Sequence, residues 1–100
     1  MESNLTVRST RPRPDVALVE LTGELDTATV PQLVAELDAG TRHVGVDLGG
    51  LTFVDSSGMR VLVEAHRAAA QHGIEFAVLP GPPAVQRAFE MAGLKDLLFS

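Results

Sequence analysis

Short apolar runs alternate along this chain with amphipathic stripes at helical spacing, and this alternation restricts the possible folds more than any other feature. Residues 16–21 and 74–79 are almost unbroken apolar runs, and residues 44–48 alternate apolar and polar side chains. Such runs are typical of buried and half-buried β-strands. The following pair, Gly49-Gly50, predicts that the middle strand ends near Leu48 in a turn. Strands that alternate with helices connect through right-handed crossovers, which predicts a mostly parallel sheet.

Three stretches carry apolar residues at the period of an amphipathic helix. The first begins at Val30, tolerates Pro31 in its first turn and is expected to end at Gly40. The second is closed by Gly73, a residue that suits the left-handed position after a helix, and the third ends at Gly93. The stripes consist of Val30, Leu33, Val34 and Leu37; of Met59, Leu62, Val63, His66, Ala69 and Ala70; and of Val85, Ala88, Phe89 and Ala92.

The two ends of the chain complete the expected fold. Residues 5–9 alternate apolar and polar side chains, as an edge strand does, and the prolines within residues 11–15 are expected to break the chain because they cannot donate to a ladder. Residues 94–100 are compatible with the start of one more short strand. The sequence therefore predicts one α/β domain over residues 1–100. Its sheet is mostly parallel and four- to five-stranded, with an antiparallel N-terminal edge strand and helices packed on the sheet.

Composition and charge exclude several classes of function. The chain has no cysteine, which excludes disulfides, a thiolate nucleophile and cysteine-based zinc sites. Residues 1–4 lack the basic region and apolar core of a signal peptide, and no apolar run approaches the length of a transmembrane helix, so a cytoplasmic location is expected. The formal net charge of −5 repels phosphate backbones and anionic lipids, which makes nucleic acid and membranes poor candidate partners.

No residue pattern indicates catalysis or metal binding. The histidines are His43, His66 and His72, and no two of them have the i, i+4 spacing of a helical metal clamp. His66 falls within a helical stripe and is interpreted as a partly buried residue at the edge of the core. Phosphate-binding, dinucleotide-binding and nucleophile-elbow motifs are absent from the sequence. The sequence thus predicts no catalytic residue, no metal site, no cofactor and no enzymatic activity.

The segment Asp55-Ser56-Ser57-Gly58 directly precedes the second helical stripe and offers the strongest functional signal. The simplest interpretation is a helix cap, in which an Asp or Ser side chain accepts hydrogen bonds from free backbone N–H groups, a role worth about 1 kcal/mol. Capping is compatible with function, because it places a serine hydroxyl at the edge of the sheet where open α/β proteins bind ligands. Gly58 lacks a Cβ and is expected to leave the approach to the serine open.

Three segments together resemble the STAS-domain anti-sigma factor antagonists, or anti-anti-sigma factors. Leu21-Thr22-Gly23-Glu24-Leu25-Asp26 contains the G-E-L-D signature of that family. Phe53-Val54-Asp55-Ser56-Ser57-Gly58-Met59 is similar to its D-S-[ST]-G-L phosphorylation motif, with Met59 in the place of leucine. Residues 85–94 are similar to its closing helix, V-x-R-x-F-x-x-x-G-L. The segments occur in the family's order and span most of the chain, so the predicted domain is of the STAS type.

The resemblance implies a partner-switching cycle. In that family, the unphosphorylated antagonist binds an anti-sigma factor that is also a serine kinase of the GHKL type, and this binding frees the sigma factor. Phosphorylation of the first serine of the motif, here Ser56, abolishes binding, and a phosphatase acting on phospho-Ser56 resets the cycle. The partner-binding residues that the resemblance implies are Asp26, Asp55, Ser56, Ser57, Gly58 and Met59.

Within this set, Ser57 and Gly58 would shape the turn that carries Ser56. Asp26 has two interpretations, as a residue that contacts the partner or as a loop residue before the first helix. Asp55 also has two, as a former of the cap and turn or as a residue that orients the Ser56 hydroxyl.

Two other classes remain open at the level of sequence. A signalling receiver domain is also a small α/β protein, but it takes phosphate on an aspartate and needs an acidic cluster after its first strand and a lysine near its fourth or fifth strand. Lys95 is the only lysine here, and no acidic pair ends the first strand. The other class is a STAS subunit of a lipid transporter or of a larger stress-signalling assembly without a phosphoswitch. The serine of the motif favours the phosphorylation-controlled antagonist.

Overall fold

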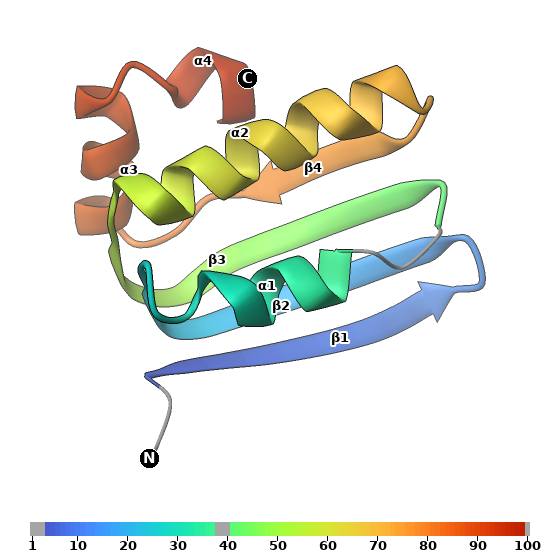
Figure 1. Ribbon diagram of the computed structural model, residues 1–100, viewed down its shortest axis with the longest axis horizontal. Coiled ribbons are helices and arrows are strands. Elements are labelled where there is room, and N and C mark those ends of the chain that lie inside the picture. The colour runs from blue at the N-terminus through green and yellow to red at the C-terminus, as the bar shows by residue number, and fades with distance from the viewer. Residues whose placement is uncertain (1–3, 38–40, 100) are drawn as a thin grey trace.

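The predicted alternation of strands and helices is present in the computed structural model, which describes residues 4–37 and 41–99 (Figure 1). The elements are, in chain order, β1 (Leu5–Arg13), β2 (Val16–Leu25), α1 (Val30–Leu37), β3 (His43–Val54), α2 (Ser56–Gln71), β4 (Glu75–Leu79), α3 (Pro83–Met91) and α4 (Lys95–Phe99). The expected end of α1 at Gly40 lies outside the described residues.

The four strands form one sheet in the order β1-β2-β3-β4. β1 runs antiparallel to β2, with Thr10 opposite Leu18. β2 and β4 both run parallel to β3, so that Val19, Val46 and Val78 lie side by side across the sheet. The prediction of a mostly parallel sheet with an antiparallel N-terminal edge strand is confirmed.

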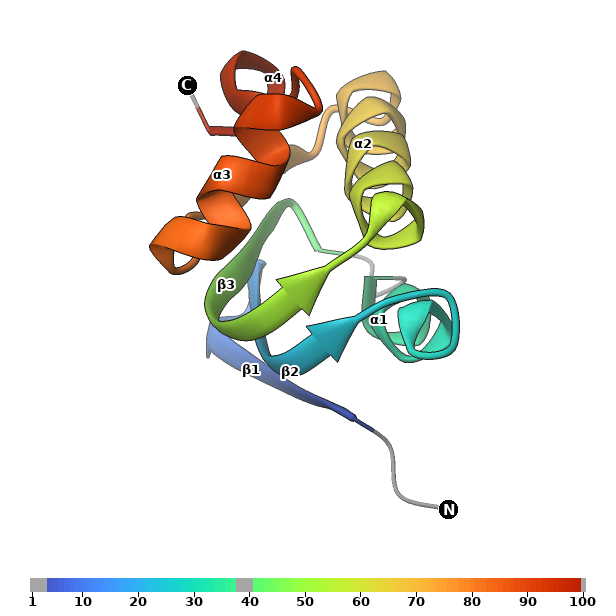
Figure 2. The ribbon, with the colours of Figure 1, turned by 90° about the vertical axis from the view of Figure 1, so that its left-hand side faces the viewer.

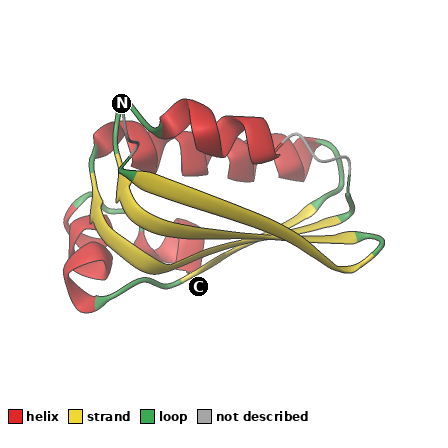
Figure 3. Ribbon diagram, turned by 90° about the horizontal axis from the view of Figure 1, so that it is seen from below, coloured by secondary structure: helices red, strands yellow, loops and turns green. Residues whose placement is uncertain are grey.

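The helices are divided between the two faces of the sheet. α1 and α2 cover one face, and α3 lies on the other, against β3 (Figures 2 and 3). α4 contacts β4 and both neighbouring helices, α2 and α3. The apolar stripes read from the sequence supply the contacts, because Leu33, Leu62 and Phe89 are fully buried. The largest fully buried side chains are Phe89, Leu21, Leu25, Leu33, Leu48, Leu51, Leu62, Val19 and Val46.

Glycines end two of the helices as predicted. Gly73 follows α2 with a φ of 68°, and Gly93 follows α3 with a φ of 75°. Both angles lie in the left-handed region, which glycine enters without the steric cost of a Cβ. The helix ends were therefore predictable from local chemistry.

The prediction that the middle strand ends near Leu48 is wrong, because β3 continues through Gly49-Gly50 to Val54. The β2–β3 ladder shifts there: Glu20 pairs with Asp47, but Thr22 pairs with Gly50. One extra residue of β3 is thus taken up in a bulge, an alternative to a turn for glycines within a strand pattern. A Cβ on Gly50 would lie 2.7 Å from the Leu21 carbonyl oxygen, which explains the glycine.

The predicted break after β1 comes later than expected. β1 extends across Pro12 to Arg13, and only Pro14 and Asp15 form the turn into β2. β1 is an edge strand, so it can hold a proline that lacks an N–H, and its ladder with β2 shifts between Thr10 and Arg13.

The expectation of a fifth strand at the C-terminal end is wrong, because residues 95–99 form the short helix α4. The amide of Leu98 donates to the carbonyl of Leu94 at 3.1 Å, and Leu98 is buried. The ring of Phe99 meets that of Phe89 edge to face, with centroids 5.1 Å apart. Tertiary packing of two apolar side chains determines this conformation, and no local pattern specified it.

Candidate functional site

The turn Asp55-Ser56-Ser57-Gly58 forms the N-terminal cap of α2. Asp55 has extended backbone angles, and its Oδ1 accepts a hydrogen bond of 3.1 Å from the amide of Gly58. The Asp55 amide donates to the carbonyl of Leu25 at 3.1 Å, which ties the cap to the end of β2. The capping interpretation of Asp55 is confirmed, and the cap lies at the carboxyl edge of the sheet, where β2 and β3 end next to each other (Figure 2).

The two serines of the turn differ in their surroundings. Ser56 is the first residue of α2, and it is exposed. Ser57 is half-buried, and its Oγ lies 2.8 Å from Oγ1 of Thr27 in the loop between β2 and α1. This hydrogen bond joins two segments 30 residues apart in sequence.

The β2–α1 loop is organised by the side chains of Asp26 and Thr29. Oδ1 of Asp26 accepts from the amides of Ala28, at 3.0 Å, and Thr29, at 3.1 Å. The Thr29 hydroxyl donates to the carbonyl of Glu24 at 2.9 Å and accepts from the Asp26 amide at the same distance. Thr29 is only 4% exposed and its bonds are partly buried, whereas the bond from the Ala28 amide is exposed. Asp26 thus shapes the loop before α1, which agrees with one of its two interpretations, and this loop lies beside the α2 cap.

Gly58 allows α2 to lie close to the end of β2. An added Cβ would stand 2.7 Å from Cγ of Leu25 and 3.0 Å from Cγ2 of Val54, and both of those residues are buried. The expectation that Gly58 keeps the approach to the serine open is wrong, because its missing Cβ would point into the core. The glycine instead sets the height of the first turn of α2 above the sheet.

Met59 is half-buried and packs against the core, and it also lines a shallow hollow of about 440 Å³ beside Ser56. The hollow lies between α2 and the segment that joins α3 to α4. Its lining residues are Ser56, Met59, Arg60, Val63, Glu64, Arg67, Ala92 and Leu94. Arg60 and Arg67 outnumber Glu64, so the hollow is locally cationic although the chain carries a formal charge of −5.

Sequence reasoning missed Thr27 and Arg60 as residues of this site. Thr27 directly follows the Gly23-Glu24-Leu25-Asp26 segment, and Arg60 lies one helical turn after Ser56. Arg60 could have been found from the sequence, because it lies four residues after Ser56 and residues i and i+4 share a helix face. The contact between Thr27 and Ser57 depends on the pairing of β2 with β3 and had no local signal.

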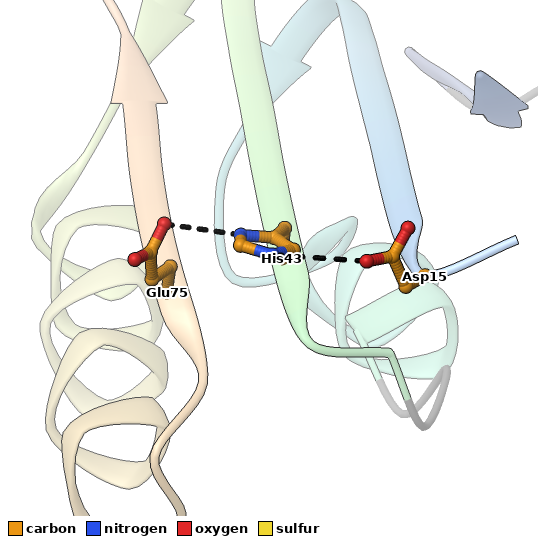
Figure 4. Close-up of polar contacts among 3 residues, drawn as sticks. All are labelled: Asp15, His43 and Glu75. Atoms are coloured by element: carbon orange, nitrogen blue, oxygen red, sulfur yellow. Dashed lines mark hydrogen bonds and ion pairs between the residues drawn. The ribbon is translucent and has the colours of Figure 1, made fainter. Parts of the chain in front are cut away.

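The histidines lie away from this edge. His43 begins β3 at the opposite edge of the sheet, where its Nδ1 lies 3.0 Å from Oε2 of Glu75 and its Nε2 lies 3.9 Å from Oδ2 of Asp15 (Figure 4). His66 is half-buried and packs edge to face on Phe76, as its place in a helical stripe predicted. Among residues 4–37 and 41–99, no group of three or more His, Cys, Asp or Glu side chains could hold a metal ion.

None of the helices within residues 4–37 and 41–99 is long and apolar enough to cross a bilayer.

Known proteins are similar to this chain over most of its length. A family model described as "Mlab, STAS domain" matches residues 9–99. The anti-sigma-B factor antagonist of Staphylococcus aureus is 37% identical over 84 residues, which are 80% of this chain and 78% of that protein. The protein of the same name from Staphylococcus epidermidis is 34% identical over the same shares of the two chains.

Solved structures show the same architecture. An anti-sigma factor antagonist from Mycobacterium paratuberculosis superposes with a TM-score of 0.82 at 23% identity, over 95% of this chain and 83% of that one. The anti-sigma factor antagonist SpoIIAA in its unphosphorylated form gives 0.79 at 21% identity, over 94% of this chain and 86% of that one. The chain therefore belongs to the STAS domain family, among the anti-sigma factor antagonists.

Proposed function

We propose that this chain is a phosphorylation-controlled anti-sigma factor antagonist. The unphosphorylated form binds an anti-sigma factor with serine kinase activity of the GHKL type and releases the sigma factor. Phosphorylation of Ser56 by the same partner abolishes binding, and a phosphatase acting on phospho-Ser56 restores the active form. The protein acts in the cytoplasm as a binding protein and performs no catalysis of its own.

The observation that carries the proposal is the exposed position of Ser56 on a capped turn. A kinase must bring the hydroxyl into its own active site, so the acceptor must be accessible. Ser56 is exposed, while the cap formed by Asp55 and the contact between Gly58 and Leu25 fix the backbone that carries it. The relatives that are at least 34% identical are named as antagonists of an anti-sigma factor, which supports this class of partner.

A phosphate on Ser56 would act mainly on the interface. Phosphoserine adds about −1.5 to −2 charge. The dipole of α2 favours an anion at its N-terminus by only about 0.3–1 kcal/mol. A unit negative charge of the partner at about 6 Å would oppose each unit charge by about 3 kcal/mol at an effective dielectric constant of 20, or about a hundredfold in affinity. We therefore expect the phosphorylated protein to stay folded and to lose its partner.

The neighbouring residues have distinct parts in this proposal. Asp55 and Gly58 hold the turn, and Ser57 and Asp26 hold the β2–α1 loop beside it. Met59 adds apolar surface in the hollow next to Ser56. The partner would then contact a surface composed of the α2 cap and the β2–α1 loop.

The experiment begins with affinity capture of the partner on the unphosphorylated protein, followed by incubation with Mg²⁺ and ATP. We expect capture of an anti-sigma factor kinase, and mass spectrometry should locate one phosphate on Ser56. Phosphate at a residue other than Ser56 or Ser57 would refute the site. Capture of a transporter ATPase in place of a kinase would favour the alternative of a STAS subunit without a phosphoswitch.

A pair of variants tests the charge mechanism. Ser56→Asp should weaken binding of the captured kinase by up to about a hundredfold, as measured by calorimetry. Ser9→Asp is the matched control, because it adds the same charge at an exposed position of β1. Equal affinities for Ser56→Asp and the unaltered protein would contradict the proposal.

A further inference from the structure

The turn contains two adjacent serines, and the proposed switch requires the kinase to accept Ser56 in preference to Ser57. Ser56 and Ser57 are chemically equivalent alcohols in the first turn of the same helix. Their side chains differ in exposure, because Ser56 is exposed and Ser57 is half-buried. They also differ in partners, because Ser57 shares a hydrogen bond with Thr27.

The hydrogen bond between Thr27 and Ser57 joins two segments that are each fixed independently. On one side, the Asp55 cap and the close contact of Gly58 with Leu25 hold the first turn of α2. On the other side, the bonds of Asp26 and Thr29 hold the backbone around Thr27. The 2.8 Å separation of the two hydroxyl oxygens is thus a consequence of the surrounding structure. The bond lies at the exposed surface, but a bond between positions that are already fixed costs little conformational entropy.

We infer that Thr27 is a specificity-determining residue, which directs phosphorylation to Ser56 by engaging the hydroxyl of Ser57. This inference rests on the proposed function. In the transfer, a serine Oγ forms a bond to the γ-phosphorus of kinase-bound ATP, the bond from that phosphorus to the β,γ-bridging oxygen breaks, and ADP leaves. The hydroxyl proton passes to a base of the kinase. Within the described residues, no hydrogen bond holds Oγ of Ser56, whereas Oγ of Ser57 must first leave Thr27.

The expected preference of the kinase for Ser56 over Ser57 follows from the hydrogen bond between Thr27 and Ser57 and from the space around it. Breaking one neutral hydrogen bond corresponds to a factor of about two to twelve in rate. A phosphoryl group on Ser57 would also have to displace the β2–α1 loop, because the oxygen that would carry it is within 2.8 Å of Thr27. Both effects act against Ser57 and leave Ser56 unaffected.

The test uses the full chain, the kinase captured as described above, and Mg²⁺ with ATP. Thr27→Val removes the hydroxyl and keeps a β-branched side chain of similar size. In the Ser56→Ala background, Thr27→Val should raise the initial rate of phosphorylation at Ser57 by about two- to twelvefold, measured by mass spectrometry. Thr27→Ser, which keeps a hydroxyl, should restore the low rate. Thr10→Val on β1 is the matched control for the loss of a threonine hydroxyl.

The outcomes test the role of Thr27 separately from the proposed phosphorylation switch at Ser56. If the unaltered protein accepts phosphate on Ser56 but Thr27→Val leaves the rate at Ser57 unchanged, the role of Thr27 is refuted and the switch stands. If the unaltered protein accepts no phosphate, both fall. Circular dichroism would show whether Thr27→Val fails to fold. In that event Thr27→Ser, which retains a hydroxyl at position 27, provides the test. A high rate of phosphorylation at Ser57 in Thr27→Ser would refute the inference.

Discussion

Two polar clusters lie at opposite edges of the same sheet, and they are built from different kinds of side chain. At the amino edge, the imidazole of His43 lies between the carboxylates of Glu75 and Asp15, and the side chain of Glu75 is 82% exposed. At the carboxyl edge, short side chains such as Asp26 and Asp55 accept hydrogen bonds from backbone amides. The first cluster joins side chains in water, and the second organises the backbone.

The two edges of the sheet differ in how closely they contact the hydrophobic core. Leu25 is fully buried, its carbonyl accepts from the amide of Asp55, and its side chain lies directly under Gly58. The side chain of His43 instead meets the carboxylates of Asp15 and Glu75, whose side chains are 53% and 82% exposed. Exposed ion pairs contribute about 0–1 kcal/mol, whereas caps and buried contacts contribute more. We therefore expect the carboxyl edge to determine stability and the amino edge to contribute little.

The largest effect is expected for Leu25→Ala. Removing a fully buried leucine should lower the free energy of unfolding by about 2–5 kcal/mol, because the site cannot collapse under both the strand end and α2. Leu97→Ala, at a residue 41% exposed on α4, is the control. Urea unfolding of both variants checks the prediction, and equal losses would contradict the link between the carboxyl edge and the core.

Asp55→Ala should have the next largest effect. It removes the acceptor of the Gly58 amide, and loss of such a cap lowers the free energy of unfolding by about 0.5–2 kcal/mol. Asp55→Asn keeps a capping oxygen and should recover most of the loss. Thermal unfolding distinguishes the two, because 1 kcal/mol corresponds to about 4–8 °C in a protein of this size. A stable alanine variant would show that the cap is dispensable.

Gly58→Ala tests whether helix propensity or close packing decides the change in the free energy of unfolding at this position. Helix propensity alone predicts a gain of about 1 kcal/mol, but the added Cβ would meet Leu25 at 2.7 Å, and overpacking costs about 1–3 kcal/mol. The net result should be a loss of up to about 2 kcal/mol in the free energy of unfolding, measured in urea. In the Leu25→Ala background the clash is mostly removed, so the same change should stabilise the protein. Stabilisation in both backgrounds would mean that close packing does not explain the glycine.

The smallest effect is expected at the amino edge. His43→Gln removes the contacts with Glu75 and Asp15, and the free energy of unfolding at pH 7 should change by no more than about 0.5 kcal/mol. The change is measured beside Asp55→Ala under identical conditions. A loss at His43 as large as that at Asp55 would remove the distinction between the two edges.

Much of the fold could be predicted from local sequence patterns. The predictions that were wrong have physical causes. The periods of the apolar residues located α1, α2 and α3, and glycines located two helix ends. The predicted end of β3 at Gly49-Gly50 was wrong because glycines suit both a turn and a bulge, and only the pairing with β2 selects between the two. The C-terminal residues misled because their helix depends on the packing of Leu98 and Phe99.

The sequence by itself determined the order of the elements, the family, and the position of Ser56 at the start of a capped helix, since each can be read from short segments of neighbouring residues without knowing which segments meet in space. Only the tertiary structure decided which hydroxyl of the turn is free. Thr27 and Ser57 lie 30 residues apart, and they meet because parallel pairing brings the ends of β2 and β3 to the same edge. The requirement for Gly58 was decided in the same way, by the side chain of Leu25 from the neighbouring strand.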